Sequence, residues 1–390
     1  MNIAIYTLTS ELHDQAAVGT ATEEFLGSLG LEHEFKGSDF ADYGTHDLDL
    51  IYVRTGGTEG IFRDLLPALR ARSSQPFRLL TSGKSNSLAA SMEILSFLRQ
   101  QGLEGEIIHG PADYIARRAG LLAKVGEARR QLRGVRLGII GRPSDWLISS
   151  GVDHRAVKGH LGIELVDIPM QELLQAIPPA QHVTACAESA GRYLPGANAI
   201  YSALRTVTET HRLQGFTLRC FDLLSAVSNT GCLALAKMNA EGYVAGCEGD
   251  IPAMLSMMAA RALTGHSGFQ ANPASINPET GEMLFAHCTI PLDMVERYEL
   301  DTHFESGIGV AIRGYVKEGP VTIFKLSGDL SRRFVAEGEL LGCQSKPGLC
   351  RTQMLIRLDD KRQTDYFLKE PIGNHHIIIQ GRHAGLFSHL

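Results

Sequence analysis

Carboxylate and imidazole side chains stand at the ends of predicted strands in the second half of the chain, where they could support metal binding or acid–base chemistry. Glu248 directly follows an apolar strand at 243–247, and Asp250 is placed to cap the helix that begins at Ile251. Open α/β sheets bind ligands at the carboxyl ends of their strands, so Glu248 is predicted to face a cleft. A carboxylate there must be solvated, paired or metal-bound, and we interpret Glu248 as functional.

Two histidine positions extend this pattern. Ala286-His-Cys288 ends one predicted strand, and Gly373-Asn-His-His376 enters another. Adjacent side chains of a strand point to opposite faces, so at most one of His375 and His376 can face a given site, and the other needs a structural role. A carboxylate and two imidazoles without thiolate would suit Mn²⁺, Fe²⁺, Co²⁺ or Zn²⁺. A hydrogen-bonded core position is the competing interpretation for each histidine.

Two glycine-containing turns after predicted strands could contact a small ligand. The backbone N–H groups of Arg54-Thr-Gly-Gly-Thr-Glu59 could hold an anion or a sugar hydroxyl, or the run could be a tight turn with Thr58 as helix cap. Gly141-Arg-Pro-Ser-Asp-Trp146 contains the single tryptophan of the chain. That indole could stack on a sugar ring or fill a structural position at a domain junction.

The elements that must position these residues change character along the chain. Up to about residue 268, short apolar strands alternate with amphipathic helices, which predicts parallel sheets covered on both faces. We divide this part into two doubly wound α/β (Rossmann-like) domains, 1–133 and 134–268, with a Pro178-Pro179 break in the second. Strands separated by turns then predict a mostly antiparallel, barrel-like β domain over 269–390. Glu248 belongs to the second domain, and His287 and His376 belong to the third.

Composition narrows the class of protein. The 390 residues carry 37 Lys and Arg against 43 Asp and Glu, a net charge of −6 that offers no footprint for nucleic acid or anionic lipid. No apolar run approaches the ~20 residues that span a bilayer, and no signal-peptide pattern precedes the first strand. The seven cysteines form no CxxC pair, which indicates free thiols in a cytoplasmic protein.

The order of the predicted domains and several runs resemble the L-fucose and L-arabinose isomerases. The runs are, in chain order, Gly231-Cys-Leu-Ala-Leu235, Ala245-Gly-Cys-Glu-Gly-Asp250, Phe269, His287 and Gly373-Asn-His-His376. The resemblance implies that Glu248, His287 and His376 bind a divalent metal, with Mn²⁺ as the expected ion, and it favours His376 over His375. It also implies an aldose–ketose isomerase that moves a proton between C1 and C2 of an open-chain sugar through an enediol.

The chain departs from the pattern of these isomerases at one ligand. A second acidic residue should stand near 269–273, and Asn272, 24 residues after Glu248, is the closest equivalent. An amide oxygen can bind a hard cation but cannot act as a base. We therefore expect Glu248 to be both ligand and base, with Asn272 as an additional ligand at the catalytic centre. Its acid partner stays open between a metal-bound water, Asp222, Asp250 and a group not yet placed.

Several side chains are assigned to the substrate. They are Trp146, Arg142, Arg219, Asp222 and His375. One form of the hypothesis has a free or modified monosaccharide as substrate. Another has an anionic sugar such as sulfoquinovose, because the missing carboxylate lowers repulsion and Arg142, Arg219 or Lys237 could pair with the anion.

Two further expectations concern function and assembly. A non-catalytic sugar-binding or regulatory protein that kept the fold and lost one acid–base carboxylate is the alternative from a different class, and a metal-dependent lyase or epimerase is another. The resemblance also implies a homo-oligomer, a trimer or hexamer, with the active site near a subunit interface.

Overall fold

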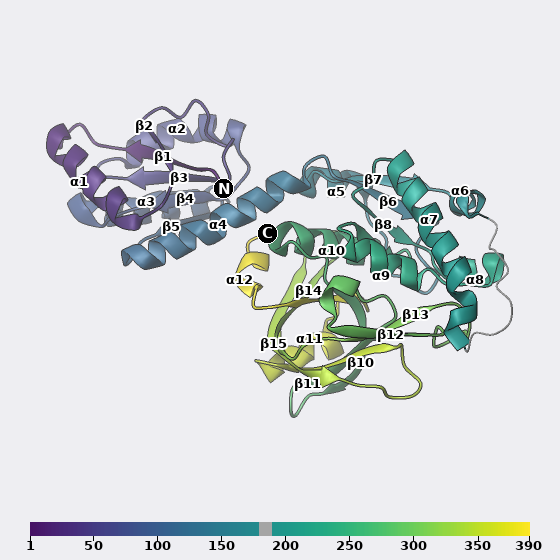
Figure 1. Ribbon diagram of the computed structural model, residues 1–390. Helices are drawn as coiled ribbons and strands as arrows, with labels where there is room; N and C mark the ends of the chain where they lie inside the picture. Colours follow the sequence, from purple (N-terminus) through teal and green to yellow (C-terminus); the bar gives the residue numbers. More distant parts are fainter. Residues whose placement is uncertain (179–188) are drawn as a thin grey trace. The chain divides into compact units, whose positions relative to one another are not determined.

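The computed structural model describes residues 1–178 and 189–390, and its contacts divide the chain into two compact units (Figure 1). The first unit comprises residues 1–130 with His389, and the second comprises residues 131–388 with Leu390. The predicted second α/β domain and the predicted β domain both fall in the second unit, so their separation into two domains stays a prediction. Of the expected Pro178-Pro179 break, Pro179 lies outside the described residues.

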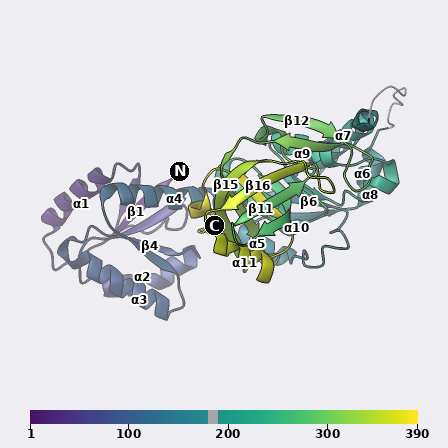
Figure 2. The same cartoon turned by 90° about the horizontal axis from the view of Figure 1, so that it is seen from below.

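The first unit is built on a five-stranded sheet in the order β2-β1-β3-β4-β5, with all strands parallel. Its strands are β1 (Ile3–Leu8), β2 (Glu34–Gly37), β3 (Leu48–Val53), β4 (Phe77–Leu80) and β5 (Gly105–Ile108). Its helices are α1 (Gln15–Leu29), α2 (Glu59–Arg72), α3 (Ser87–Gln100) and α4 (Ala112–Leu132). Figure 2 shows α1 and α4 on one face of this sheet and α2 and α3 on the other.

The alternating side chains of β1 explain this double covering. Ile3 and Ile5 belong to the core formed with α1 and α4, whereas Tyr6 and Leu8 belong to the core formed with α2 and α3. A parallel strand that is covered on both faces must be apolar at nearly every position, and all six residues of β1 are buried. The prediction of an α/β class is therefore confirmed for this unit.

The turn from Arg54 to Glu59 is held by its own contacts. The Ser10 N–H donates to Thr55 Oγ1 over 3.0 Å, and the Gly56 N–H donates to the Ser85 carbonyl over 2.7 Å. Thr58 precedes α2, but its hydroxyl donates to the Thr55 carbonyl and makes no capping bond to the helix. Thr58 is therefore the N-cap residue of α2, as the sequence predicts, while its hydroxyl is used inside the turn and not in a capping bond.

The second unit contains a four-stranded parallel sheet in the order β7-β6-β8-β9. Its strands are β6 (Arg136–Ile140), β7 (Glu164–Ile168), β8 (Gly215–Leu218) and β9 (Val244–Cys247). The helices of this part are α5 (His154–Leu161), α6 (Met170–Ala176), α7 (Leu194–Thr210), α8 (Asp222–Val227), α9 (Cys232–Ala240) and α10 (Ile251–Thr264).

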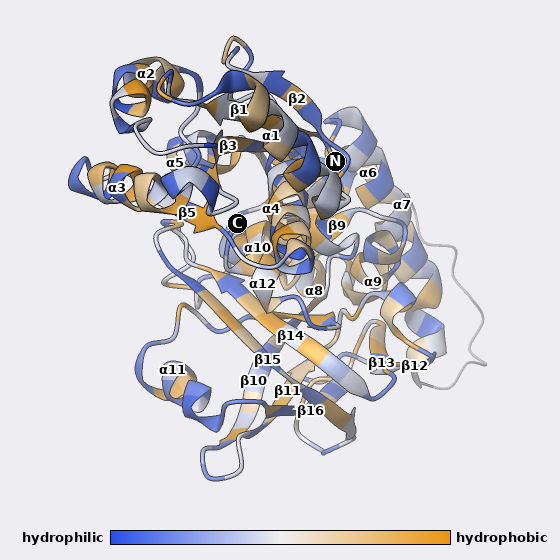
Figure 3. Cartoon of the chain, turned by 90° about the vertical axis from the view of Figure 1, so that its left-hand side faces the viewer, coloured by the Kyte–Doolittle hydropathy of each residue, from blue (hydrophilic) through white to orange (hydrophobic). Residues whose placement is uncertain are grey.

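A closed antiparallel barrel follows, in the strand order β10-β11-β16-β15-β14-β17. The strands are β10 (Phe269–Asn277), β11 (Glu282–His287), β14 (Gly319–Leu326), β15 (Arg333–Cys343), β16 (Thr352–Leu358) and β17 (His376–Gln380). A separate two-stranded sheet is formed by β12 (Arg297–Asp301) and β13 (Ala311–Tyr315), and two short helices are α11 (Thr364–Lys369) and α12 (Ala384–Phe387). Along β15, buried positions such as Phe334 and Ala336 alternate with more exposed ones, which is the two-residue period of a barrel strand. Figure 3 shows hydrophobic and hydrophilic colours mixed along the barrel strands, and the prediction of a β-barrel-like region is confirmed.

Helix α10 joins the sheet to the barrel. It contacts β8 and β9 on the sheet side and β10, β14 and β17 on the barrel side. Because it is covered by both layers, every residue from Ile251 to Ala260 is buried, and the helix has no polar face there. Its first turn therefore lies where the end of β9 meets the barrel, which is the place that the candidate site occupies.

The cysteines and the hydropathy of the helices can be compared with what the composition predicts. The six cysteines among the described residues are all free thiols, as their spacing predicts. Within the same residues, no helix joins the length and the apolar sequence that a bilayer crossing requires.

Candidate metal centre

Three side chains that could ligate a cation converge at the junction of sheet and barrel. Glu248 follows β9, His287 ends β11 and His375 immediately precedes β17, and their ligand atoms lie within 4.8 Å of one another. Glu248 Oε1 is 3.6 Å from His287 Nε2 and 3.5 Å from His375 Nε2. The exposed fraction of these side chains is 12% for Glu248, 5% for His287 and 0% for His375. A carboxylate and two imidazoles can therefore hold a metal ion here.

A tight turn after β9 aims Glu248 at the two histidines. Glu248 has a left-handed backbone with φ 62°, and Gly249 continues the turn with φ 70°. The Gly249 N–H donates to the Leu218 carbonyl over 2.9 Å, and the Ser144 N–H donates to the Glu248 carbonyl over 2.9 Å. A side chain at position 249 would collide with the backbone of Arg142 and Pro143. Only glycine fits there, and the strained backbone of Glu248 is typical of functional turns.

The opposite nitrogen of each imidazole has its own partner. His287 Nδ1 is 3.1 Å from Thr289 Oγ1, and His375 Nδ1 is 2.8 Å from Asp250 Oδ2. Such contacts fix the ring orientation and leave Nε2 for a metal, as is usual around ligating histidines. His375 Nε2 is fully buried and has no hydrogen-bond partner in the structure. An orphaned buried nitrogen that faces a carboxylate fits a bound cation.

The structure places His376 away from this cluster. His376 Nε2 is 2.9 Å from the Tyr366 hydroxyl, and its ring packs against Phe334 and Phe367. His375 and His376 point in opposite directions because they are adjacent in extended backbone. The structure therefore brings His375, and not the expected His376, together with Glu248 and His287, while His376 is held by Tyr366.

Burial and charge act in opposite directions on the ionisation of the cluster. Burial alone would raise the pKa of Glu248, but the adjacent imidazoles of His287 and His375 hold it well below its usual range. Burial would lower the pKa of His375, whereas Asp250 and Glu248 raise it to about 9. The pKa of His287 is lowered, chiefly by burial. The shifts of Glu248 and His375 go in opposite directions, and each favours the charged form of its group.

Asp250 lies behind His375 rather than beside the open face of the cluster. It is fully buried, and its Oδ1 accepts the Ala253 N–H over 2.8 Å, so that it caps α10 as the sequence predicts. Lys325 Nζ lies 3.6 Å from Asp250 Oδ2. Burial raises the pKa of Asp250, but Lys325 and His375 lower it to about 2. Both carboxylate oxygens of Asp250 are thus used by α10, His375 and Lys325, and its catalytic role stays a prediction.

Asn272 makes its own contact between two elements of the barrel. It lies on β10 opposite Ala286 of β11, and its Oδ1 accepts a hydrogen bond of 3.2 Å from Asn374 Nδ2. Nearby Gln270 is buried and occupied, because its Oε1 accepts the Cys247 N–H over 2.8 Å. The hydrogen bond between Asn272 and Asn374 ties β10 to the loop before β17, and the ligand role of Asn272 stays a prediction.

Aromatic side chains form the rim of the site. The Trp146 indole N–H donates to Glu248 Oε2 over 2.8 Å, while 52% of the residue is exposed. Phe221 meets Trp146 edge-on with ring centroids 4.9 Å apart, and His303 meets Phe221 at 5.6 Å. The sequence prediction that Trp146 belongs to the site region is compatible with this contact, and its stacking on a sugar stays a prediction.

Four residues near the site are not anticipated by the sequence argument. His303 and Glu305 lie on the loop after β12, and their environment includes the charges of Glu248 and His287. Thr289 and Lys325 act behind the histidines. Of these four, only Lys325 has a signal in the sequence, because it lies inside the apolar strand 319–326. A buried ammonium requires a buried carboxylate, so this lysine predicts an acidic partner in the interior.

The charged residues assigned to a substrate are largely engaged with one another. Arg219 binds Asp145 over 2.8 Å and Asp222 over 3.0 Å. Arg142 pairs with Asp145 over 3.1 Å but remains mostly exposed. Lys237 lies over the Tyr201 ring at 3.9 Å. Arg142 is the cation with the fewest constraints, and it is close to the site because its carbonyl packs against Gly249.

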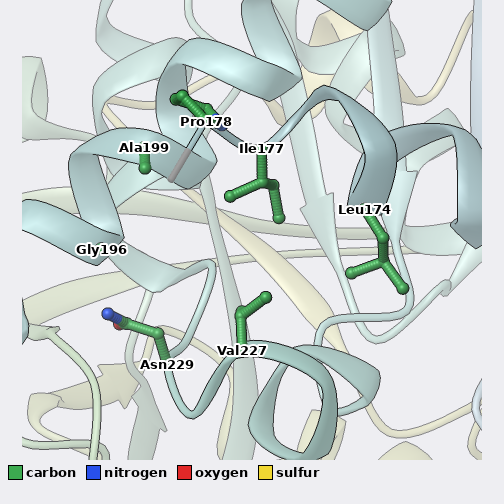
Figure 4. A pocket seen from close by; sticks show the side chains of 7 residues that line it. All are labelled: Leu174, Ile177, Pro178, Gly196, Ala199, Val227 and Asn229. Atoms are coloured by element: carbon green, nitrogen blue, oxygen red, sulfur yellow. The ribbon is translucent and has the colours of Figure 1, made fainter. Parts of the chain in front are cut away.

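A cavity elsewhere in the second unit has a different character (Figure 4). It encloses about 220 Å³ and is bordered by mostly apolar residues: Leu174, Ile177, Pro178, Gly196, Ala199, Val227 and Asn229. None of these described residues is ionisable, so this lining provides no group for acid–base chemistry.

No protein-family model matches the chain. Over 278 residues the chain is 22% identical to a sulfoquinovose isomerase from Alkalicoccus urumqiensis. The match covers 66% of this chain and 63% of the relative, so the chain spans less than two thirds of that protein's length.

Proposed function

We propose that this protein is a divalent-metal-dependent aldose–ketose isomerase. The observation that carries the proposal is the convergence of Glu248 Oε1 with the Nε2 atoms of His287 and His375, one of which is buried without a partner. The similarity to a sulfoquinovose isomerase supports isomerase chemistry on a sugar. Carboxylate and imidazole ligands without thiolate suit several divalent metals, and Mn²⁺ is the one we propose because the resemblance to the sugar isomerases implies it.

The chain's own residues would carry the proton transfer. When bound, the cation supplies Lewis-acid polarisation of the sugar oxygens at C1 and C2. Glu248 takes the proton from C2 of the open-chain aldose and returns it to C1 of the enediol, so one carboxylate serves both half-reactions. The Trp146 N–H fixes Oε2 of that carboxylate and orients it toward the rim.

The second proton, which moves between the oxygens at C2 and C1, needs another group. Asp250 is buried behind His375, and Asp222 is paired with Arg219. We assign this step to His303, which lies on the rim, and whose Nδ1 is 3.1 Å from Ser306 Oγ while burial lowers its pKa. His303→Gln is expected to lower kcat without lowering metal affinity. Equal kcat values for the variant and the wild type would contradict this assignment.

The test of the main proposal couples metal content to turnover. Purified protein is analysed for bound metals and assayed on a panel of aldoses and ketoses with EDTA and with added Mn²⁺. The proposal expects isomerisation that EDTA abolishes and Mn²⁺ restores, and that Glu248→Gln eliminates. Metal and sugar binding without any turnover across the panel would instead favour the non-catalytic sugar-binding alternative.

A second candidate is an isomerase for an anionic sugar such as sulfoquinovose. The name of the relative favours it, and Arg142 could pair with the anion by giving up Asp145, since its side chain is 71% exposed. Comparing kcat/KM on sulfoquinovose and on neutral aldoses separates the two substrates. Arg142→Gln should raise KM for the anionic sugar and leave KM for a neutral sugar unchanged.

We also propose a homo-oligomer, a trimer or hexamer, with the active site near a subunit interface. Exposed apolar residues beside the site support an interface there, because Ile148 is 95% exposed and Trp146 is 52% exposed. Sedimentation velocity at micromolar concentration tests the proposal, and a monomer would overturn it.

A further inference from the structure

Lys325 occupies a position that lysine rarely takes. It belongs to β14, where its neighbours Phe324 and Leu326 are also buried, and only 1% of its side chain is exposed. Placing an ammonium group in such an interior costs several kcal/mol unless a carboxylate compensates it. Among the described residues, the carboxylate that forms an ion pair with Lys325 is Asp250, with 3.6 Å between Nζ and Oδ2.

Asp250 makes more contacts than a helix cap requires. Its Oδ1 accepts the Ala253 N–H over 2.8 Å, which is the capping bond. Its Oδ2 lies 2.8 Å from His375 Nδ1 and 3.6 Å from Lys325 Nζ. A neutral Ser or Asn would cap α10 equally well. The capping bond therefore does not explain the negative charge of Asp250 or the buried lysine beside it. Both concern Oδ2, the oxygen that faces His375.

We propose that Lys325 is a positioning residue of the metal centre: its buried ammonium stabilises the carboxylate of Asp250, and that carboxylate holds His375 so that Nε2 faces the cation. The inference deepens the proposed function and rests on it. Lys325 acts through two residues and touches neither cation nor substrate.

The charges of the cluster explain why a lysine is needed. A histidine ligates a metal through an unprotonated nitrogen, so His375 must be neutral in the loaded protein. Asp250 would then be a fully buried carboxylate with only neutral hydrogen-bond donors, which is unfavourable. Lys325 compensates that charge, while Glu248 contributes the negative charge that meets the cation.

A purely structural role for Lys325 is the competing explanation, since β14 packs against α10. The chain offers a matched control for this role. Ser256 of α10 accepts the Leu326 N–H over 2.9 Å and donates to the Pro252 carbonyl over 2.7 Å, and neither hydrogen bond involves His375. Ser256→Ala therefore loosens the same helix–barrel packing and leaves the Lys325–Asp250–His375 chain in place.

The experiment measures the Mn²⁺ dissociation constant of the full chain by isothermal titration calorimetry. Lys325→Met is expected to weaken Mn²⁺ binding about 10- to 100-fold, as loss of a supporting contact around a ligand does, and Ser256→Ala less than about 3-fold. Asp250→Asn should weaken binding to a similar degree. Because Lys325 acts through Asp250, the double variant K325M/D250N should bind Mn²⁺ no more weakly than Asp250→Asn alone.

The double variant also keeps the inference testable if Lys325→Met does not fold. Lys325→Met leaves a buried charge on Asp250, whereas K325M/D250N removes both charges and keeps the volumes. Wild-type affinity in folded Lys325→Met, or additive losses in the double variant, would overturn the inference while leaving the metal centre intact. If the wild-type chain itself binds no Mn²⁺, the proposed function fails, and this inference fails with it.

Discussion

His287 and His375 lie with their ring centroids 5.3 Å apart and their planes at 68°, and each directs Nε2 toward the same oxygen of Glu248. They come from elements separated in sequence, the end of β11 and the loop before β17. Strand β10 pairs with both β11 and β17, so closure of the barrel is what brings the histidines together. The geometry gives four predictions.

The two adjacent histidines should behave differently when replaced. His375→Ala is expected to weaken Mn²⁺ binding more than about 100-fold and to abolish isomerisation, because it removes a ligand. His376→Gln should leave Mn²⁺ affinity within about 3-fold of wild type, because His376 faces Tyr366 and not Glu248. Calorimetric titration of both variants checks this, and strong loss of affinity in His376→Gln with retention in His375→Ala would reverse our assignment.

Bound metal should stabilise the protein against heat. A ligand that binds only the folded state at 100 times its dissociation constant adds about 2.7 kcal/mol, which for a unit of this size raises Tm by roughly 5–10 °C. Differential scanning calorimetry with EDTA and with Mn²⁺ measures the shift. The same comparison on Glu248→Gln is the control, and an equal shift in that variant would show that the metal binds elsewhere.

The free energy of unfolding should fall at acid pH because His376 is buried. Burial lowers the pKa of His376 to about 3 in the folded protein, from about 6.5 in the unfolded chain. Because the folded pKa is depressed, this residue contributes stability that is present above pH 6.5 and is lost as the pH falls toward 3. Between pH 6.5 and pH 5, the unfolding free energy of wild type should fall by about 2 kcal/mol more than that of His376→Gln. Urea titrations in EDTA at both pH values measure this, and parallel losses in the two proteins would contradict it.

Gly249 should not tolerate a side chain. Its φ is 70°, and an added Cβ would lie 2.8 Å from Pro143 Cα, so Gly249→Ala is expected to cost about 2–4 kcal/mol of stability. Gly265→Ala is the matched control, since Gly265 has φ 86° but no atom within 4 Å of the added Cβ, and it should cost only about 1 kcal/mol. Urea unfolding measures the loss of stability in both variants. Equal losses would mean that the collision at position 249 is relieved without a cost in stability.

The sequence was sufficient for features with a local physical cause. The mostly apolar β1 and the alternation of strands and helices predicted covered parallel sheets, and the turn-rich final third predicted antiparallel strands. Asp250 was predicted to cap α10, and the structure confirms the bond to Ala253. Glu248 stood out because a carboxylate directly after a buried strand needs a partner.

Only the tertiary structure decided which partners meet. The sequence predicted that His375 and His376 point apart, because they are adjacent in a strand. Which of them faces Glu248 depends on the closure of the barrel and on the aromatic side chains around Tyr366. The link from Lys325 through Asp250 to His375 joins a barrel strand, a helix cap and a loop, so no sequence period relates them. Local pattern fixes how each segment folds, whereas a site made from three segments exists only once their packing has brought the charges within a few ångströms of one another.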